Sequence, residues 1–263
     1  MKKVKKLNLL MIPNINLKVK LKNLMESGST TSSYNVEYEP TIVIPGREMK
    51  NRIPGEYPDV PSKEKAKNNT SILHACKLLK AYYNQTGIKA LILDGREMRT
   101  TRTLQSLGTN LKYINIVEYN NQTYEKMIKK KIPNIHCHNC HIKEYVYELN
   151  DPNTNVVYFD IMSTLFTSQK SYGSDIIINE FLRQSCVNEM VFAATFCLRN
   201  SISQSYEIQQ KKILLLLDKI FTVNGFNSKR LLAKNKLRYK GQNTGNKSMM
   251  FVLFYLFRKE GRK

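Results

Sequence analysis

The sequence lacks an apolar run long enough to cross a membrane as a helix. Its longest run, Met249–Phe257, is far shorter than the roughly 20 residues that such a helix needs. The β-branched and aromatic residues of this run are typical of a buried strand. We therefore expect no membrane-spanning segment.

The chain also lacks the cysteine pattern and the leader of a secreted protein. Its five cysteines are an odd number spread over 263 residues, and no apolar secretory segment is found near the amino terminus. This pattern predicts reduced thiols and an intracellular protein, cytoplasmic or nuclear, that is not secreted. The lysine-rich first 23 residues leave an organellar presequence as an alternative, which the absence of Arg and Ser there disfavours.

Acidic residues are scarce. Against 42 Lys and Arg the chain has 21 Asp and Glu, so its net charge at pH 7 is +21. A field this positive favours polyanionic partners, which are RNA, DNA or an anionic membrane surface. Hydrophobic residues make up 41% of the chain, which is enough to bury the core of one large domain. The frequent Lys, Asn and Ile indicate an AT-rich genome, that of a virus or its host.

The first 70 residues differ from the rest. Residues 25–33 are a polar, Ser- and Thr-rich link, and prolines punctuate the stretch that follows. We expect residues 1–70 to be an irregular basic arm that caps a site or binds a protein partner, and residues 71–263 to be one domain. Between them, apolar residues of Asn69–Asn84 recur at the spacing of an amphipathic helix.

From residue 89 onward, short apolar runs alternate with helical stretches, which is the pattern of an α/β fold with a mostly parallel sheet. The end of the chain departs from this pattern. Arg230–Tyr239 and Ser248–Arg258 are joined by a turn too short for a crossover helix, so we expect an antiparallel hairpin. The expected parallel strands are 90–93, 113–117, 135–137, 156–159 and 190–197, and the expected helices are 98–107, 122–131, 175–187 and 205–220.

Acidic residues follow three of the expected strands. Asp94 and Gly95 come after the first, Glu118 after the second and Asp160 after the fourth. Ligands of open α/β sheets bind beyond the carboxyl ends of the strands, so these residues are expected to meet at one crevice. A carboxylate after the second strand can accept both hydroxyls of a ribose, and Gly95 lets the backbone approach a ligand. The simpler explanation of each acid is a carboxylate stabilised by the start of a helix.

This order of motifs resembles the class I S-adenosylmethionine-dependent methyltransferases, a Rossmann-like fold whose last strand inserts antiparallel. The motifs are Leu91-Ile92-Leu93-Asp94-Gly95, Ile116-Val117-Glu118 and Val157-Tyr158-Phe159-Asp160, and the resemblance covers about residues 70–260. It implies S-adenosylmethionine as cofactor, bound by Asp94, Gly95, Glu118 and Asp160. It also implies methyl transfer in which Asp160 orients or deprotonates the nucleophile and Ser163 or Tyr158 adds a hydrogen bond.

Arginines after the first strand indicate the class of substrate. Arg96, Arg99 and Arg102 are spaced by three, which places them near one helix face where they could clamp phosphate. Together with the net charge, they predict a methyltransferase that acts on nucleic acid, RNA ahead of DNA.

A second basic group lies near the end of the chain. Lys236, Arg238 and Lys240 stand beside aromatic residues, a combination used for sequence-tolerant nucleic-acid binding. The competing explanation is a solvated charged surface with no ligand.

Two alternatives to this function stay open. The loop of residues 94–102 has one glycine and three arginines, and the motif that begins at Asp160 lacks the Pro-Pro-aromatic sequence of amino-group methyltransferases. These features favour a catalytically inactive protein that keeps the fold and serves as a nucleic-acid-binding or scaffold module. A methyltransferase of proteins or small molecules is the other alternative, and the positive charge argues against it.

Three of the four histidines and two cysteines lie within His136–His141. Imidazole and thiolate are ligands of Zn²⁺, but six consecutive residues do not readily surround one ion with tetrahedral geometry. A redox role for Cys137 and Cys140 is disfavoured because the pair does not open a helix after a strand. We expect no metal site, and we place the segment at the rim of the crevice, where His138 or His141 could touch a ligand.

Overall fold

The protein is described by a computed structural model over residues 63–83, 87–160, 173–198, 205–231, 238–240 and 248–258. None of the helices in these ranges is long and apolar enough to cross a membrane. Most of the expected arm lies outside them, so the division of the chain at residue 70 stays a prediction.

The described residues form an eight-stranded sheet. Strands β1 to β5 are parallel and lie in the order β3, β2, β1, β4, β5. Next to β5 lies β8, which is antiparallel to β5, β6 and β7. The strands are β1 (Ile88–Ile92), β2 (Leu111–Val117), β3 (Ile135–His138), β4 (Val156–Asp160), β5 (Glu189–Leu198), β6 (Ser228–Leu231), β7 (Arg238–Lys240) and β8 (Ser248–Phe257).

This strand order confirms the expected fold. Five parallel strands are followed by an antiparallel strand, β8, that is inserted between β5 and β6. The chain therefore has the Rossmann-like sheet of class I S-adenosylmethionine-dependent methyltransferases. The long connections between parallel strands carry helices that cover the sheet, as the alternating sequence pattern predicts.

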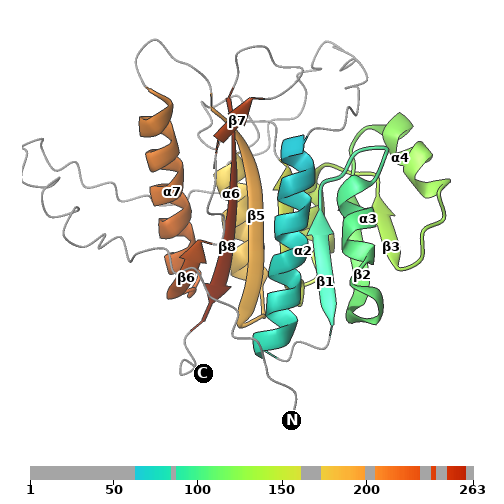
Figure 1. Cartoon of the computed structure of the whole chain (residues 1–263), viewed down its shortest axis with the longest axis horizontal. Coiled ribbons are helices and arrows are strands. Elements are labelled where there is room, and N and C mark those ends of the chain that lie inside the picture. The colour runs from blue at the N-terminus through green and yellow to red at the C-terminus, as the bar shows by residue number, and fades with distance from the viewer. Residues whose placement is uncertain are drawn as a thin grey trace, which may run out of the picture. The chain divides into compact units, whose positions relative to one another are not determined.

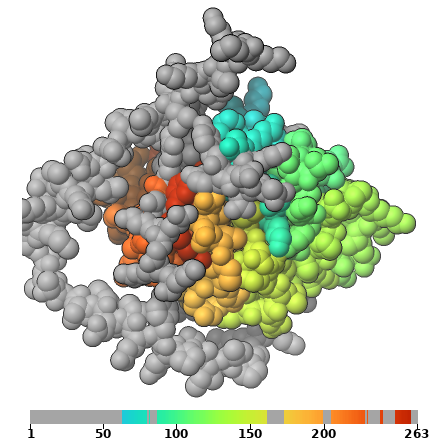
Figure 2. Space-filling view, turned by 90° about the horizontal axis from the view of Figure 1, so that it is seen from below, coloured from blue at the N-terminus to red at the C-terminus, as the bar shows by residue number. Residues whose placement is uncertain are grey.

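Helices cover both faces of the sheet (Figure 1). Side chains of α2, α3 and α4 bury one face, and side chains of α6, α7 and η2 bury the other. Figure 2 shows the order of the elements across the sheet from below. The green segments of β2, β3 and α4 lie at one end, and the orange and red segments of α7 and β8 lie toward the other. The helices are α2 (Lys63–Tyr83), α3 (Arg99–Gln105), η1 (Gly108–Asn110), α4 (Asn121–Ile128), α5 (Ile142–Glu144), η2 (Tyr145–Leu149), α6 (Ser174–Gln184) and α7 (Tyr206–Val223).

The first described helix begins earlier than the sequence predicts. We expected a start at Asn69, but α2 begins at Lys63, because the Lys, Glu and Ala residues after Pro61 are strong helix formers. Asn69 is buried inside the helix, and its Oδ1 accepts a hydrogen bond from the Thr100 hydroxyl at 3.1 Å. Asn69 therefore joins α2 to α3 instead of capping a helix.

The carboxy-terminal hairpin also differs in detail. The strand expected over Arg230–Tyr239 is two short strands, β6 and β7, which pair with opposite ends of β8. The residues between them, 232–237, lie outside the described residues. The antiparallel direction is confirmed, because both short strands run opposite to β8.

Candidate functional site

The candidate site lies at the carboxyl edge of the parallel strands. In Figure 1 this edge is at the top, where the first turns of α2 and the short strand β7 also lie. Asp94 and Glu118 follow β1 and β2, and Asp160 is the last residue of β4. The fold therefore places the three predicted acids at the same edge, as the rule for open α/β sheets requires.

Asp94 organises the loop after β1. Its Oδ2 accepts hydrogen bonds from the backbone N–H and the hydroxyl of Thr101, both at 2.8 Å. Its Oδ1 accepts one from the N–H of Gly95 at 3.0 Å. Asp94 thus ties the loop to the first turn of α3, and its contribution to a ligand site is to hold the backbone of the loop in place.

Met98 gives the same loop an unusual backbone. It precedes α3 in the left-handed region, with φ 52° and ψ 45°, and its side chain is buried in the core under α2 and α3. Glycine and asparagine normally occupy this conformation, and other residues pay about 1–2 kcal/mol for it. The loop therefore turns sharply with a single glycine, Gly95, which is exposed.

Glu118 lies half-buried after β2. Its Oε1 accepts a hydrogen bond from the N–H of Asn120 at 2.7 Å, and its own N–H donates to the carbonyl of His138 at 3.0 Å. Burial raises the pKa of Glu118 above its ordinary value of 4.5, although the hydrogen bonds from the N–H groups of Asn120 and Tyr119 oppose the shift. A half-buried carboxylate at the edge of a sheet can accept hydrogen bonds from a diol.

Asp160 forms an ion pair that the sequence did not reveal. The Nζ of Lys65, in the first turns of α2, lies 2.8 Å from Asp160 Oδ2. The other oxygen, Oδ1, is buried and makes no hydrogen bond with the described residues. The side chain of Asp160 is 15% exposed, and the ion pair engages one of its two carboxylate oxygens.

Tyrosines and a threonine surround this carboxylate. Thr195 lies opposite Asp160 in the register of β4 and β5, and its hydroxyl is 3.2 Å from that of Tyr158. The hydroxyl of Tyr239, from β7, lies beside Thr195 and Asn68, but it makes no hydrogen bond of normal geometry with the described residues. Burial, followed by the charge of Asp160, raises the pKa of both tyrosines, so both remain protonated phenols.

The three arginines of the first loop do not share one helix face. Arg96 lies in the turn before α3, so the spacing argument applies only to Arg99 and Arg102 on the helix. Arg96 Nε lies 3.5 Å from Glu97 Oε1, and its carbonyl accepts a hydrogen bond from Lys130 of α4. The arginines remain candidates for phosphate binding, with Arg102 the most exposed to solvent.

Of the four remaining predicted site residues, only Arg238 has a described side chain. Arg238 donates to Glu207 Oε1 at 2.7 Å and lies over the ring of Tyr206, so it joins β7 to the start of α7. Lys240 belongs to β7, and its side chain lies outside the described atoms. Ser163 and Lys236 lie outside the described residues, so their roles stay predictions.

The histidine and cysteine segment lies at the free edge of the sheet. His138 Nε2 lies 3.1 Å from Asn115 Oδ1, and burial lowers the pKa of His138. His141 caps α5, because its Nδ1 accepts the N–H of Lys143 at 3.1 Å. Within the part of the chain that the structure describes, no group of three or more His, Cys, Asp or Glu side chains is placed to hold a metal ion.

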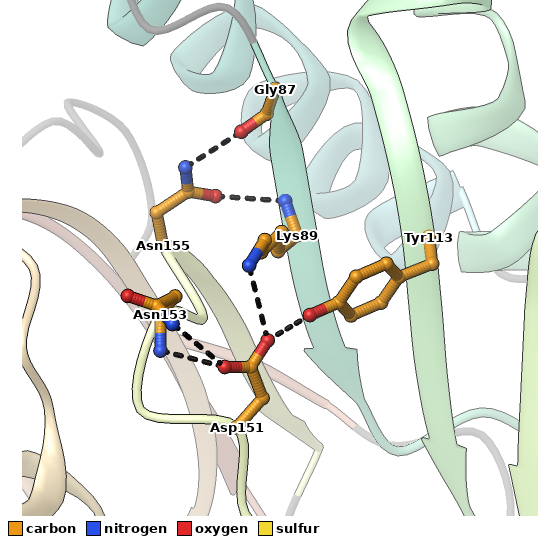
Figure 3. A network of polar contacts seen from close by, with 6 residues as sticks. All are labelled: Gly87, Lys89, Tyr113, Asp151, Asn153 and Asn155. Atoms are coloured by element: carbon orange, nitrogen blue, oxygen red, sulfur yellow. Dashed lines mark hydrogen bonds and ion pairs between the residues drawn. The ribbon is translucent and has the colours of Figure 1, made fainter.

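A separate polar network lies at the opposite, amino edge of the sheet (Figure 3). Asp151 accepts hydrogen bonds from the hydroxyl of Tyr113 and the N–H of Asn153, and its Oδ2 lies 3.5 Å from Lys89 Nζ. Asn155 joins the strands, accepting from the N–H of Lys89 at 3.0 Å and donating to a carbonyl at the start of β1 at 2.9 Å. The network holds β1, β2 and β4 together and lies away from the crevice.

No local sequence pattern marks Lys65, Asn68 and Tyr239 as site residues. Lys65 lies in the expected arm, where lysines are frequent, and no local pattern relates it to Asp160. Asn68 precedes the helix start expected at Asn69, and Tyr239 stands out only as an aromatic residue within a basic tail. The strong helix propensity of residues 63–67 is a signal for the first two, because it extends α2 to include Lys65 and Asn68.

Comparison with known proteins supplies structural matches only. Protein-family models and curated protein sequences gave no match. An rRNA methylase from Streptococcus thermophilus matches with a TM-score of 0.49 and 10% identity, over 76% of this chain and 99% of that chain. The plantazolicin methyltransferase BamL matches with a TM-score of 0.49 and 8% identity, over 74% and 88%. EvdMO1 matches with a TM-score of 0.44 and 8% identity over 71% of this chain, which spans 41% of the length of EvdMO1. The assignment of the fold rests on the strand order of the sheet itself.

Proposed function

We propose that the chain is an S-adenosylmethionine-dependent methyltransferase that acts on nucleic acid, with RNA the preferred substrate over DNA. The observation that carries the proposal is Asp160 at the end of β4, with one oxygen held by Lys65 and the other buried without a hydrogen bond among the described residues. A buried carboxylate oxygen is nearly always hydrogen-bonded, so an unbonded one at the ligand edge of this fold indicates a place for a substrate group.

The residues present fit the cofactor in part. Glu118 is a half-buried carboxylate at the position that accepts ribose hydroxyls, and Gly95 leaves the backbone of the first loop exposed. Asp94 uses both oxygens to hold this loop, so we assign it a positioning role. S-adenosylmethionine, when bound, supplies the electrophilic methyl group.

The protein residues would align the nucleophile and handle its proton. Asp160 Oδ1 accepts a hydrogen bond from the substrate atom that is to be methylated. It takes the proton of that atom, directly or through water, as the bond between that atom and the methyl carbon forms. Lys65 fixes the orientation of the carboxylate through Oδ2. Because the transfer needs no covalent enzyme intermediate, the rate gain comes mainly from the placement of the two substrates.

The charge of the chain supports nucleic acid as the substrate. A net charge of +21 attracts polyanions, and Arg99 and Arg102 present cations on α3 beside the first loop. RNA or DNA reaching the crevice from this side would meet these cations before it reaches Asp160. A protein or a neutral small molecule would gain little from them.

Calorimetric titration of the full chain tests cofactor binding. We expect S-adenosylmethionine and S-adenosylhomocysteine to bind in the micromolar range, and Glu118→Gln to weaken binding about tenfold because a charge-assisted hydrogen bond is lost. Glu125→Gln is the matched control, since Glu125 is an exposed acid of α4. Absence of heat with the wild-type chain would contradict the enzyme and favour the catalytically inactive binding module.

Transfer of a tritiated methyl group tests the substrate. Single-stranded RNA, DNA of the same sequence, and a mixture of basic and acidic proteins are each incubated with the full chain and labelled cofactor. We expect label in RNA above that in DNA and none in protein. Label in protein alone would overturn the assignment to nucleic acid.

A further inference from the structure

Three buried polar atoms around Asp160 make no hydrogen bond with the described residues. They are the amide Nδ2 of Asn68, the Oδ1 of Asp160 and the hydroxyl of Tyr239. They come from three elements, α2, β4 and β7, that are far apart in the sequence. Buried polar groups are hydrogen-bonded in the great majority of cases, so three unbonded atoms in one cluster need a physical explanation.

The contacts of the cluster bring these atoms to one place. Asn68 lies one turn along α2 from Lys65, whose Nζ is 2.8 Å from Asp160 Oδ2. The hydroxyl of Tyr239 lies beside Asn68 and Thr195, and Thr195 is the register partner of Asp160. Asn68 is 9% exposed, so its amide is almost removed from bulk water.

The three atoms are complementary to one kind of polar group. The amide of Asn68 is a donor, the carboxylate oxygen of Asp160 is an acceptor, and burial and the charge of Asp160 keep Tyr239 protonated and able to donate. A group that accepts from the two donors and donates to the carboxylate would satisfy all three atoms.

Tyr239 lies near Asp160 because it belongs to β7, a short strand that pairs with one end of β8. Strand β7 lies off the main strand path and pairs only with the first three residues of β8. That pairing places Tyr239 opposite Met249, at the carboxyl edge of β5. The short strand is therefore the element that brings a phenol close to Asp160.

We infer that Asn68 and Tyr239, together with Asp160, form the pocket that binds the methyl-accepting group of the substrate. The acceptor group takes hydrogen bonds from the Asn68 amide and the Tyr239 hydroxyl and donates one to Asp160 Oδ1. This inference rests on the proposed function, because it assigns the acceptor to the same crevice. Asn68 and Tyr239 are binding residues here, and Asp160 is the residue that handles the proton.

Two substitutions that remove the unbonded atoms test the inference. Asn68→Leu and Tyr239→Phe keep the size of each side chain and remove a buried polar group. We expect a melting temperature close to or above that of the wild type for both, because Tyr239 has only poorly aligned contacts with Asn68 and Thr195 to lose and a buried polar atom disappears. We also expect the KM for single-stranded RNA to rise about tenfold, while the Kd for S-adenosylhomocysteine stays at the wild-type value.

Tyr255→Phe is the matched control. Tyr255 lies on β8 in the same core, and its hydroxyl donates to the carbonyl of Ala75 at 3.3 Å. Removing this hydroxyl deletes an existing hydrogen bond, so we expect a lower melting temperature and an unchanged KM. Only the control is therefore expected to lower the melting temperature, and only the test variants are expected to raise the KM for RNA.

The outcomes separate this inference from the proposed function. If the wild-type chain binds the cofactor and methylates no nucleic acid, the proposed function is wrong. If the wild-type chain methylates RNA but both variants keep its KM and kcat, the pocket is wrong. A melting temperature lowered in both variants as in Tyr255→Phe would show a structural role and would also overturn the inference.

Discussion

The two edges of the sheet use polar residues in different ways. At the amino edge, both oxygens of Asp151 and both ends of the Asn155 amide are hydrogen-bonded within the protein (Figure 3). At the carboxyl edge, Asn68, Asp160 and Tyr239 each leave a buried polar atom without a hydrogen bond among the described residues. The first arrangement stabilises the sheet, whereas the second costs stability, and we propose that a ligand satisfies its unbonded atoms.

Unbonded buried atoms occur near both edges of the sheet, so their number alone does not distinguish the edges. Asn150 and Thr154, close in sequence to the amino-edge network, also have one buried oxygen each without a hydrogen bond. The carboxyl edge differs because two donors, the Asn68 amide and the Tyr239 hydroxyl, lie near one carboxylate, whose other oxygen is paired with Lys65. Such a cluster has the composition of a binding pocket, whereas isolated oxygens do not.

The largest expected effect is on activity at the carboxyl edge. Asp160→Asn should reduce methyl transfer to RNA by about a hundredfold or more, because the amide cannot accept the proton of the nucleophile. Unfolding free energy should change by less than about 1 kcal/mol, since Lys65 is 43% exposed and the pair is screened by solvent. Labelled methyl transfer and urea denaturation measure the two quantities. Comparable transfer by Asp160→Asn and the wild type would break the contrast between the edges.

The opposite result is expected at the amino edge. Asp151→Ala should lower the free energy of unfolding by about 2–3 kcal/mol, because Tyr113 and Lys89 lose their shared acceptor. Affinity for S-adenosylhomocysteine should be unchanged at temperatures where the variant is folded. Urea denaturation and calorimetric titration together decide the prediction, and a loss of affinity without a loss of stability would contradict it. Asp151→Asn retains a hydrogen-bond acceptor, so its free energy of unfolding should decrease less than that of Asp151→Ala.

A smaller effect is expected where the loop of the carboxyl edge is strained. Met98→Gly relieves a left-handed backbone that costs about 1–2 kcal/mol, but it removes a buried side chain that contributes about 2–5 kcal/mol. We therefore expect a net loss of about 2 kcal/mol in urea denaturation. Asn134→Gly is the control, because Asn134 is exposed, has φ 60° and tolerates this conformation. A stabilised Met98→Gly would show that backbone strain outweighs packing in this loop.

The sequence was sufficient for the fold and for the acids of the crevice. Alternating apolar runs and helices predicted the parallel sheet, and Asp94, Glu118 and Asp160 follow the strands as expected. The sequence could not supply the partners of these acids. Lys65 meets Asp160 across 95 residues, and Tyr239 depends on a three-residue strand that pairs far along β8. Such contacts are set by tertiary packing, which local periodicity does not encode.

The placement of the arginines shows the same limit. Equal spacing predicted one helix face, but the left-handed turn at Met98 delays the start of α3 until Arg99. Arg96 is therefore left in the turn, where its carbonyl is held by Lys130. The threefold spacing places side chains on one face only within a helix, and the left-handed backbone of Met98 keeps Arg96 outside α3.

The smallest expected effect is a shift in the pH dependence of cofactor binding. Burial raises the pKa of Glu118 above 4.5, so protonation of this carboxylate begins at a higher pH than for an exposed glutamate. Because the ionised form accepts hydrogen bonds from a diol, affinity for S-adenosylhomocysteine should fall as pH decreases through this raised pKa. The protonated form is favoured in the folded state, so the contribution of Glu118 to stability should increase over the same decrease in pH.

Calorimetric titration from pH 7 to pH 5 measures the affinity. Glu118→Gln should bind S-adenosylhomocysteine more weakly than the wild type at pH 7, and its affinity should not change with pH. Glu125→Gln should keep the wild-type affinity at pH 7 and the same decrease in affinity at lower pH. An identical pH profile in Glu118→Gln and the wild type would show that this carboxylate does not contact the cofactor.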